Sequence, residues 1–184
     1  VGGTYTGTNP DTVSFGDVRI IENPIKEGYT FTGWTVTDTD TQVSIPDVLV
    51  GKTLTMPAKN VTLTASYTVN EYTLTIDPVG GTYTGTNPDT VAFNDTREIT
   101  DPVKEGYTFT SWTVTETNTT NLVDNILVGK TLTMPAKNVT LTANYTANKY
   151  TVRFIDGENI MDTKQVEYGQ TVENIEEPTK EHNI

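Results

Sequence analysis

Three aspartates, Asp38, Asp40 and Asp47, come nearest in type and spacing to a metal site. Calcium is a hard cation that binds several oxygen ligands, and carboxylates supply them. However, the copy of this segment 78 residues later replaces all three aspartates with Glu and Asn, and neither copy has the Asp-x-Asp-x-Asp-Gly order of a calcium loop. We therefore expect a solvated acidic loop, with no metal and no cofactor.

Catalytic side chains are scarce in this chain. His182 is the single histidine, and the sequence contains no cysteine. A serine or threonine nucleophile requires a neighbouring base, and without cysteine there is neither a thiolate nucleophile nor a thiolate metal site. No Ser–His–Asp arrangement can recur along the chain, so the sequence predicts a protein that is not an enzyme.

A covalent crosslink between lysine and asparagine is a further possibility. Lys52, Lys59 and Asn60 all recur 78 residues later, and Glu27 recurs as a carboxylate that could catalyse the bond. Such a crosslink requires the pair to be buried together beside the carboxyl group, and Lys and Glu are seldom buried. We expect these residues to be exposed in turns and at strand edges.

Aromatic residues could bind sugar or build a core. Tyr29, Phe31 and Trp34 could form a sugar-binding platform, but a small module needs its large aromatic side chains for packing, so we favour the core. Tyr5 and Tyr83 stand beside paired glycines. They are the better candidates for exposure and are our speculative binding residues.

The chain repeats itself with a fixed period. Residues 1–78 and 79–156 align without a gap, and about two-thirds of the aligned positions are identical. A period of this kind indicates a modular array. We predict three repeats: residues 1–70, which lack their first strand; residues 71–148, which are complete; and residues 149–184, which are truncated and divergent.

The sequence of the repeats predicts β-strands, because β-branched Thr is abundant and apolar residues alternate with it. Tyr72 to Ile76 is the clearest strand, and Tyr150 to Phe154 is its counterpart in the third repeat. In Gly106 to Thr115 the apolar residues change parity, which predicts a β-bulge near Ser111. We also predict a single helical turn at Ile126 to Val128, ending at Gly129.

The formal net charge of −12 excludes two classes of partner. Nucleic acid binding depends on Lys and Arg that neutralise phosphates, and anionic membranes attract basic segments. No apolar run is long enough to insert into a membrane. The acidity favours solubility and mutual repulsion between chains.

Two motifs carry a family resemblance. Glu27 to Trp34 (EGYTFTGW) and Met56 to Ala65 (MPAKNVTLTA) resemble the internalin B-repeat, also called the Listeria–Bacteroides repeat. The resemblance covers the whole chain. It implies tandem, mostly-β modules with a β-grasp-like (ubiquitin-like) fold and no catalytic residues. Because short strands at regular spacing also suit it, an immunoglobulin-like β-sandwich is the alternative.

The resemblance also implies a location outside the cell, on a Gram-positive bacterial surface or in its wall. We expect a non-catalytic spacer or stalk that projects other domains. The alternative is an adhesive module that binds host glycan or surface protein by multivalency.

The boundaries of the repeats suggest exchange of strands between chains. The first repeat lacks the strand that opens the second, and Tyr150 to Phe154 opens a third repeat that is incomplete. An incomplete sheet leaves backbone groups that can accept a strand from elsewhere. We expect the third-repeat strand of one molecule to fill the gap in the first repeat of another.

Overall fold

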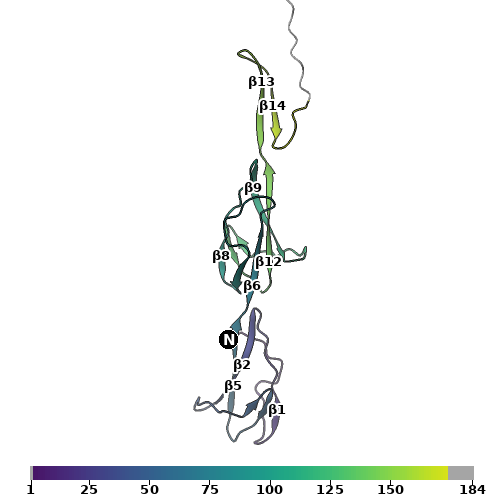
Figure 1. The fold of residues 1–184 in the computed structure, drawn as a ribbon. Coiled ribbons are helices and arrows are strands. Elements are labelled where there is room, and N and C mark those ends of the chain that lie inside the picture. The colour runs from purple at the N-terminus through teal and green to yellow at the C-terminus, as the bar shows by residue number, and fades with distance from the viewer. Residues whose placement is uncertain (1, 174–184) are drawn as a thin grey trace, which may run out of the picture. The chain divides into compact units, whose positions relative to one another are not determined.

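The computed structural model describes residues 2–173, and all of its regular structure is β-strand (Figure 1). The expectation of a mostly-β fold is confirmed. The choice between β-grasp-like and immunoglobulin-like architecture stays a prediction. Among the described residues, no helix is long and apolar enough to cross a membrane.

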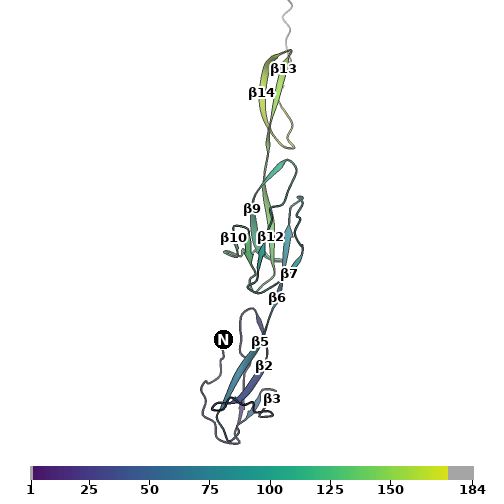
Figure 2. The same cartoon turned by 90° about the vertical axis from the view of Figure 1, so that its left-hand side faces the viewer.

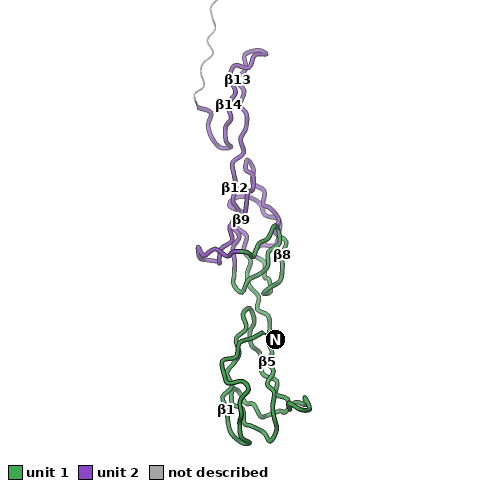
Figure 3. The backbone as a smooth tube through the Cα atoms, turned by 180° about the vertical axis from the view of Figure 1, so that it is seen from behind, with its two compact units in different colours: residues 1–74, 89–98, 125–138 green, residues 75–88, 99–124, 139–184 purple. Residues whose placement is uncertain are grey.

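The chain divides into two compact units that interleave along the sequence (Figure 3). The first comprises residues 1–74, 89–98 and 125–138, and the second comprises residues 75–88, 99–124 and 139–184. The three predicted repeats are residues 1–70, 71–148 and 149–184.

The first repeat contains five strands, which are β1 (Val18–Ile20), β2 (Tyr29–Asp38), β3 (Leu49–Val50), β4 (Thr53–Thr55) and β5 (Val61–Val69). They form a three-stranded sheet in the order β1-β4-β3 and a two-stranded sheet of β2 and β5. All the pairings are antiparallel.

The second repeat has two additional strands and a larger sheet. Its strands are β6 (Glu71–Asp77), β7 (Asp89–Ala92), β8 (Thr96–Glu98), β9 (Tyr107–Glu116), β10 (Leu127–Val128), β11 (Thr131–Thr133) and β12 (Val139–Ala147). Four of them pair in the order β7-β6-β12-β9, and the other three in the order β10-β11-β8 (Figure 2). The predicted strand at Tyr72 to Ile76 is therefore present as β6, between β7 and β12.

The core of the second repeat follows from the alternation of apolar residues with Thr. Leu74 and Ile76 on β6 are 2% and 3% exposed, because residues two apart point to the same face of a strand. The fully buried side chains of this repeat are Val91, Leu132, Met134, Val139 and Leu141.

The predicted β-bulge is present in both long hairpins, one residue earlier than expected. In β9, Phe109 pairs with Tyr145 and Ser111 pairs with Asn144, so Thr110 has no partner in the ladder. Thr32 is skipped in the same way in β2. The extra residue restores the parity, and Phe109 and Trp112 lie on one face with ring centroids 5.1 Å apart.

The predicted helical turn at Ile126 to Val128 is wrong. Leu127 and Val128 form the short strand β10, which pairs with β11 across a turn at Gly129 and Lys130. A short apolar run does not distinguish a strand from a helical turn. Here the pairing with β11 makes this segment a strand. Gly129 has φ = 61°, which suits this turn.

In the third repeat, the described residues form one antiparallel hairpin of β13 (Lys149–Asp156) and β14 (Asn159–Glu167). The strand predicted at Tyr150 to Phe154 is thus present. His182 lies outside the described residues.

Candidate functional site: the joint between repeats

A single residue separates the last strand of the first repeat from the first strand of the second. That residue is Asn70, because β5 ends at Val69 and β6 begins at Glu71. Its backbone N–H donates to the carbonyl oxygen of Gly28 (2.9 Å), and its own carbonyl oxygen accepts from the N–H of Phe93 (2.9 Å). Asn70 therefore connects a residue of each neighbouring repeat.

The side chain of Asn70 is also hydrogen-bonded. Thr30 donates a hydrogen bond from its Oγ1 to Asn70 Oδ1 at 2.6 Å. A linker whose N–H, carbonyl and side chain are all bonded has fewer conformations than a free linker.

Aromatic rings cover the same connection. The ring of Tyr29 meets the ring of Phe93 edge-on, with centroids 5.9 Å apart and planes at 82°. Lys26 places its Nζ 3.6 Å from the centroid of the Tyr29 ring, which is cation–π geometry. Contacts of this kind are each worth about 0.5–1.5 kcal/mol.

The connection between the second and third repeats uses the same contacts. Asn148 donates its N–H to the carbonyl of Gly106 (2.9 Å), accepts from the N–H of Tyr168 (2.8 Å), and its Oδ1 accepts from Thr108 Oγ1 (2.6 Å). The rings of Tyr107 and Tyr168 lie edge-on at 5.6 Å. These two sets of contacts are the two joints of the chain.

Tyr145 anchors one side of the second joint. Its ring contacts that of Tyr107 at 6.4 Å, and its hydroxyl donates to the carbonyl of Pro78 at 2.8 Å. Burial, with a smaller contribution from the negative charge of Asp77, raises the pKa of Tyr145 above its usual range. The hydroxyl is therefore protonated at neutral pH and can donate this bond.

The two tyrosines suggested as binding residues lie outside the joints. Tyr5 and Tyr83 are each half-buried, so the expectation that they are exposed is wrong. Tyr5 packs edge-on against Trp34 at 6.0 Å, and Tyr83 packs against Trp112 at 6.4 Å. Their rings also lie directly over Gly7 and Gly85, where a Cβ would overlap them, which explains the glycine two residues after each tyrosine.

The aspartates considered for calcium do not form one site. Asp38 is 6% exposed, and its Oδ1 accepts from the N–H groups of Asp40 (2.9 Å) and Thr41 (3.2 Å), while Oδ2 pairs with Lys59 at 2.9 Å. The hydrogen bond from Lys59, with those from Thr41 and Asp40, lowers the pKa of Asp38 to about 2. Asp38 is thus a turn-capping residue and not part of a solvated loop.

Within residues 2–173, no three His, Asp or Glu side chains lie close enough to hold a metal ion. The lysines considered for a crosslink form ion pairs instead. Lys52 pairs with Glu22 at 2.8 Å, and the side chains of Lys52 and Lys59 are 50% and 58% exposed. Neither lysine has the burial that an amide crosslink requires.

The amino-acid sequence does not mark the joint residues as a group. The available signal was an aromatic residue at the same position of every repeat, namely Phe15, Phe93 and Tyr168. Each is followed by a residue with positive φ, which is Gly or Asn. The partner of this aromatic residue lies about 65 positions away in sequence, so no local pattern connects them.

Comparison with known families agrees with the repeat structure. The family model described as "Divergent InlB B-repeat domain" matches residues 1–71 and again residues 72–149. The chain belongs to the InlB B-repeat family. Residues 150–183 match the model described as "Listeria-Bacteroides repeat domain". The resemblance expected from the sequence motifs is confirmed.

Two curated proteins illustrate where such repeats occur. Internalin H of Listeria monocytogenes serovar 1/2a is 40% identical over 126 residues, which are 68% of this chain and 20% of Internalin H. A putative Gly-rich membrane protein of Evansella cellulosilytica is 29% identical over 170 residues, 88% of this chain and 19% of that protein. This chain of InlB B-repeats therefore spans about a fifth of the length of these relatives. No solved structure matches it.

Proposed function

We propose that this chain is a non-catalytic spacer of a bacterial surface protein, located outside the cell, which holds another domain at a distance. The observation that carries the proposal is the recurrence of one joint, with the same hydrogen bonds around Asn70 and Asn148. A spacer needs repeats that are joined in a reproducible way, and a bonded one-residue linker restricts the bending of the chain. The similarity to Internalin H supports the proposed location in a bacterial surface protein.

Multivalent binding to host glycan or protein stays the alternative prediction. The residues suggested for it, Tyr5 and Tyr83, are occupied in contacts with Trp34 and Trp112. Half-buried rings that already pack against the module offer little free surface to a ligand. The geometry therefore favours the spacer.

The test is surface display. A small reporter binder is placed at the end of this chain on a bacterial surface that carries a polymer brush of graded height, and capture of bead-bound ligand is measured. We expect capture to persist at brush heights where the binder without the chain fails. A Gly/Ser linker of equal residue number should reach less far, because a flexible coil lengthens only with the square root of its residue number.

The same display strain without the binder tests the alternative. Saturable attachment of that strain to host cells, abolished by Tyr5→Ala and Tyr83→Ala together, would contradict a pure spacer and favour an adhesive module. Capture equal to that of the Gly/Ser linker would also contradict the spacer.

A further inference from the structure

Two neighbouring strands of the second repeat carry its connections to the rest of the chain. β6 begins at Glu71, directly after Asn70 of the first joint, and β12 ends at Ala147, directly before Asn148 of the second joint. The two strands are adjacent in the sheet order β7-β6-β12-β9. A pulling force along the chain therefore enters this repeat through β6 and leaves it through β12.

Contacts at both ends show that β6 and β12 run in the same direction. Thr73, near the start of β6, donates its N–H at 2.8 Å to Oδ1 of Asn138, which directly precedes β12. Tyr145, near the end of β12, donates its hydroxyl at 2.8 Å to the carbonyl oxygen of Pro78, which directly follows β6. Because start lies beside start and end beside end, the two strands are parallel.

The parallel arrangement determines how a pulling force acts on the pair. Glu71 and Ala147, through which the force passes, lie at opposite ends of the two strands. Tension therefore slides β6 along β12, so the backbone hydrogen bonds between them must break together and not one after another. Each buried polar group left unpaired in this way costs about 1–3 kcal/mol.

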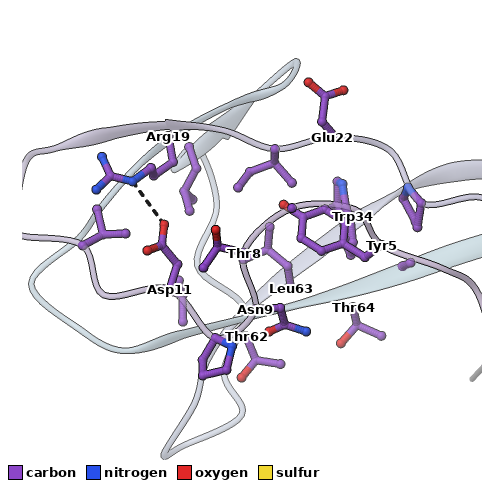
Figure 4. Close-up of a pocket in the computed structure, with 18 of the residues that line it drawn as sticks. Tyr5, Thr8, Asn9, Asp11, Arg19, Glu22, Trp34, Thr62, Leu63 and Thr64 are labelled. Carbon is purple, nitrogen blue, oxygen red and sulfur yellow. Dashed lines mark hydrogen bonds and ion pairs between the residues drawn. The ribbon is translucent and has the colours of Figure 1, made fainter.

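Apolar packing protects these hydrogen bonds from water on one face of the sheet. Leu74 and Ile76 on β6 are buried, and so are Val139, Leu141 and Ala143 on β12. A hydrogen bond in such surroundings is stronger than one exposed to water. In the first repeat the counterpart of Leu141 is Leu63, which is half-buried and lines a pocket (Figure 4). The experiments below therefore pull on the second repeat alone.

We propose that the second repeat carries tension along the chain, because β6 and β12 resist being pulled past each other. Such tension arises whenever the two ends of the chain are held by different bodies. The inference goes beyond the spacer role, which requires reach but no resistance to a pulling force, and it does not depend on that role.

The experiment is single-molecule force spectroscopy on the whole chain. The sequence has no cysteine, so a pair of introduced cysteines defines where the two tethers attach. Val69→Cys with Lys149→Cys places the tethers at exposed residues on either side of the second repeat. In this arrangement only the residues between them carry the force, and β6 is pulled along β12.

The control pulls the same two strands in another direction. Val69→Cys with Lys137→Cys attaches both tethers beside the starts of β6 and β12, so the strands separate from one end, one bond after another. At the same pulling speed, we expect the force that unfolds the repeat to be several-fold lower than with tethers at residues 69 and 149. The length gained, at most about 3.3–3.6 Å for each residue between the tethers, identifies the unfolding repeat.

Two sets of substitutions separate resistance to force from thermodynamic stability. Asn138→Ala with Tyr145→Phe removes the side-chain hydrogen bonds at both ends of the pair, so it should lower the force measured with tethers at residues 69 and 149. Asn87→Ala is the matched control. It removes two hydrogen bonds to Ile76 from the segment that precedes β7, on the other side of β6. We expect Asn87→Ala to lower the free energy of unfolding in urea but to leave this force unchanged.

Two results would overturn the proposal. The first is an equal unfolding force in the two pulling directions. The second is a force between residues 69 and 149 that Asn87→Ala lowers, while Asn138→Ala with Tyr145→Phe leaves it unchanged although circular dichroism shows that the strands are retained. Neither result affects the capture measured in the display experiment, so the tension proposal and the spacer proposal can fail separately.

Discussion

Gly28 lies directly against the ring of Phe93, so close that a Cβ at Gly28 would overlap the ring atoms. Gly28 also has φ = 73°, a conformation that favours glycine. The same relationship holds between Gly106 (φ = 75°) and Tyr168. Each joint thus depends on a glycine for two reasons, the space beneath an aromatic ring and the backbone angle.

Gly28→Ala is expected to loosen the first joint. The Cβ must displace the Phe93 ring, and alanine at positive φ adds a cost on the order of 1 kcal/mol. The amide of Asn70, which donates to the carbonyl of Gly28, should then exchange with solvent faster, as measured by hydrogen exchange. Gly16→Ala is the matched control, because Gly16 has φ = 81° but no atom within 4 Å of its Cβ position. Equal exchange in both variants would contradict the role of the ring contact.

Leu141→Ala should destabilise the second repeat more than Leu63→Ala destabilises the first. Leu141 lies on β12, the neighbour of β6 in the sheet, and is fully buried, so its truncation costs about 2–5 kcal/mol, whereas Leu63 is half-buried and lines a pocket of the first repeat. The first and second repeats have one tryptophan each, so Trp34→Phe or Trp112→Phe backgrounds let fluorescence follow urea unfolding of one of these repeats at a time. Equal losses would contradict the difference in burial between the two leucines.

Asn87→Ala tests how a side chain completes the sheet. Asn87 Oδ1 accepts from the N–H of Ile76 (2.8 Å), and its Nδ2 donates to the carbonyl of Ile76 (2.7 Å). Since Ile76 is buried, losing these two hydrogen bonds should lower the free energy of unfolding by about 1–3 kcal/mol. Asn9→Ala is the control: Asn9, at the equivalent position, lines a pocket of the first repeat, so this substitution should cost far less. Urea denaturation of both variants decides, and a larger cost for Asn9→Ala would refute the argument.

Low pH should destabilise the first repeat, because Asp38 becomes protonated. Its pKa in the folded chain is about 2, below the ordinary value of 3.8, so it contributes stability above pH 3.8 that is lost as the pH falls toward 2. Asp38→Asn removes this contribution, and the difference in melting temperature between the parent and the variant should shrink across that pH range. Lys59→Met should act in the same direction, because Lys59 is the main cause of the low pKa. A difference that is constant with pH would contradict the assignment.

The strands that could be predicted from the sequence are those with a local signal. β6 follows from the alternation in Tyr72 to Ile76, and the bulge in β9 follows from the change of parity between Phe109 and Trp112. Both depend on side-chain period alone. Strand β8, with three residues, has no local signal, and the apolar run at Ile126 to Val128 fits a helical turn as well as it fits β10, since both strands form by pairing with β11.

The joint could not be predicted because it depends on residues far apart in sequence. Gly28 and Phe93 belong to different repeats, and the sequence around either residue gives no indication of the other.

The most direct test of the spacer is the distance between the first two repeats, measured by double electron–electron resonance. The chain has no cysteine, and Val50 and Val128, at equivalent positions, are 71% and 74% exposed, so Val50→Cys with Val128→Cys gives two clean labelling sites. We predict one narrow distance distribution, which Tyr29→Ala with Asn70→Gly broadens. Tyr107→Ala, in the other joint, should leave it narrow. A distribution already as broad as that of a Gly/Ser-linked pair would contradict the account.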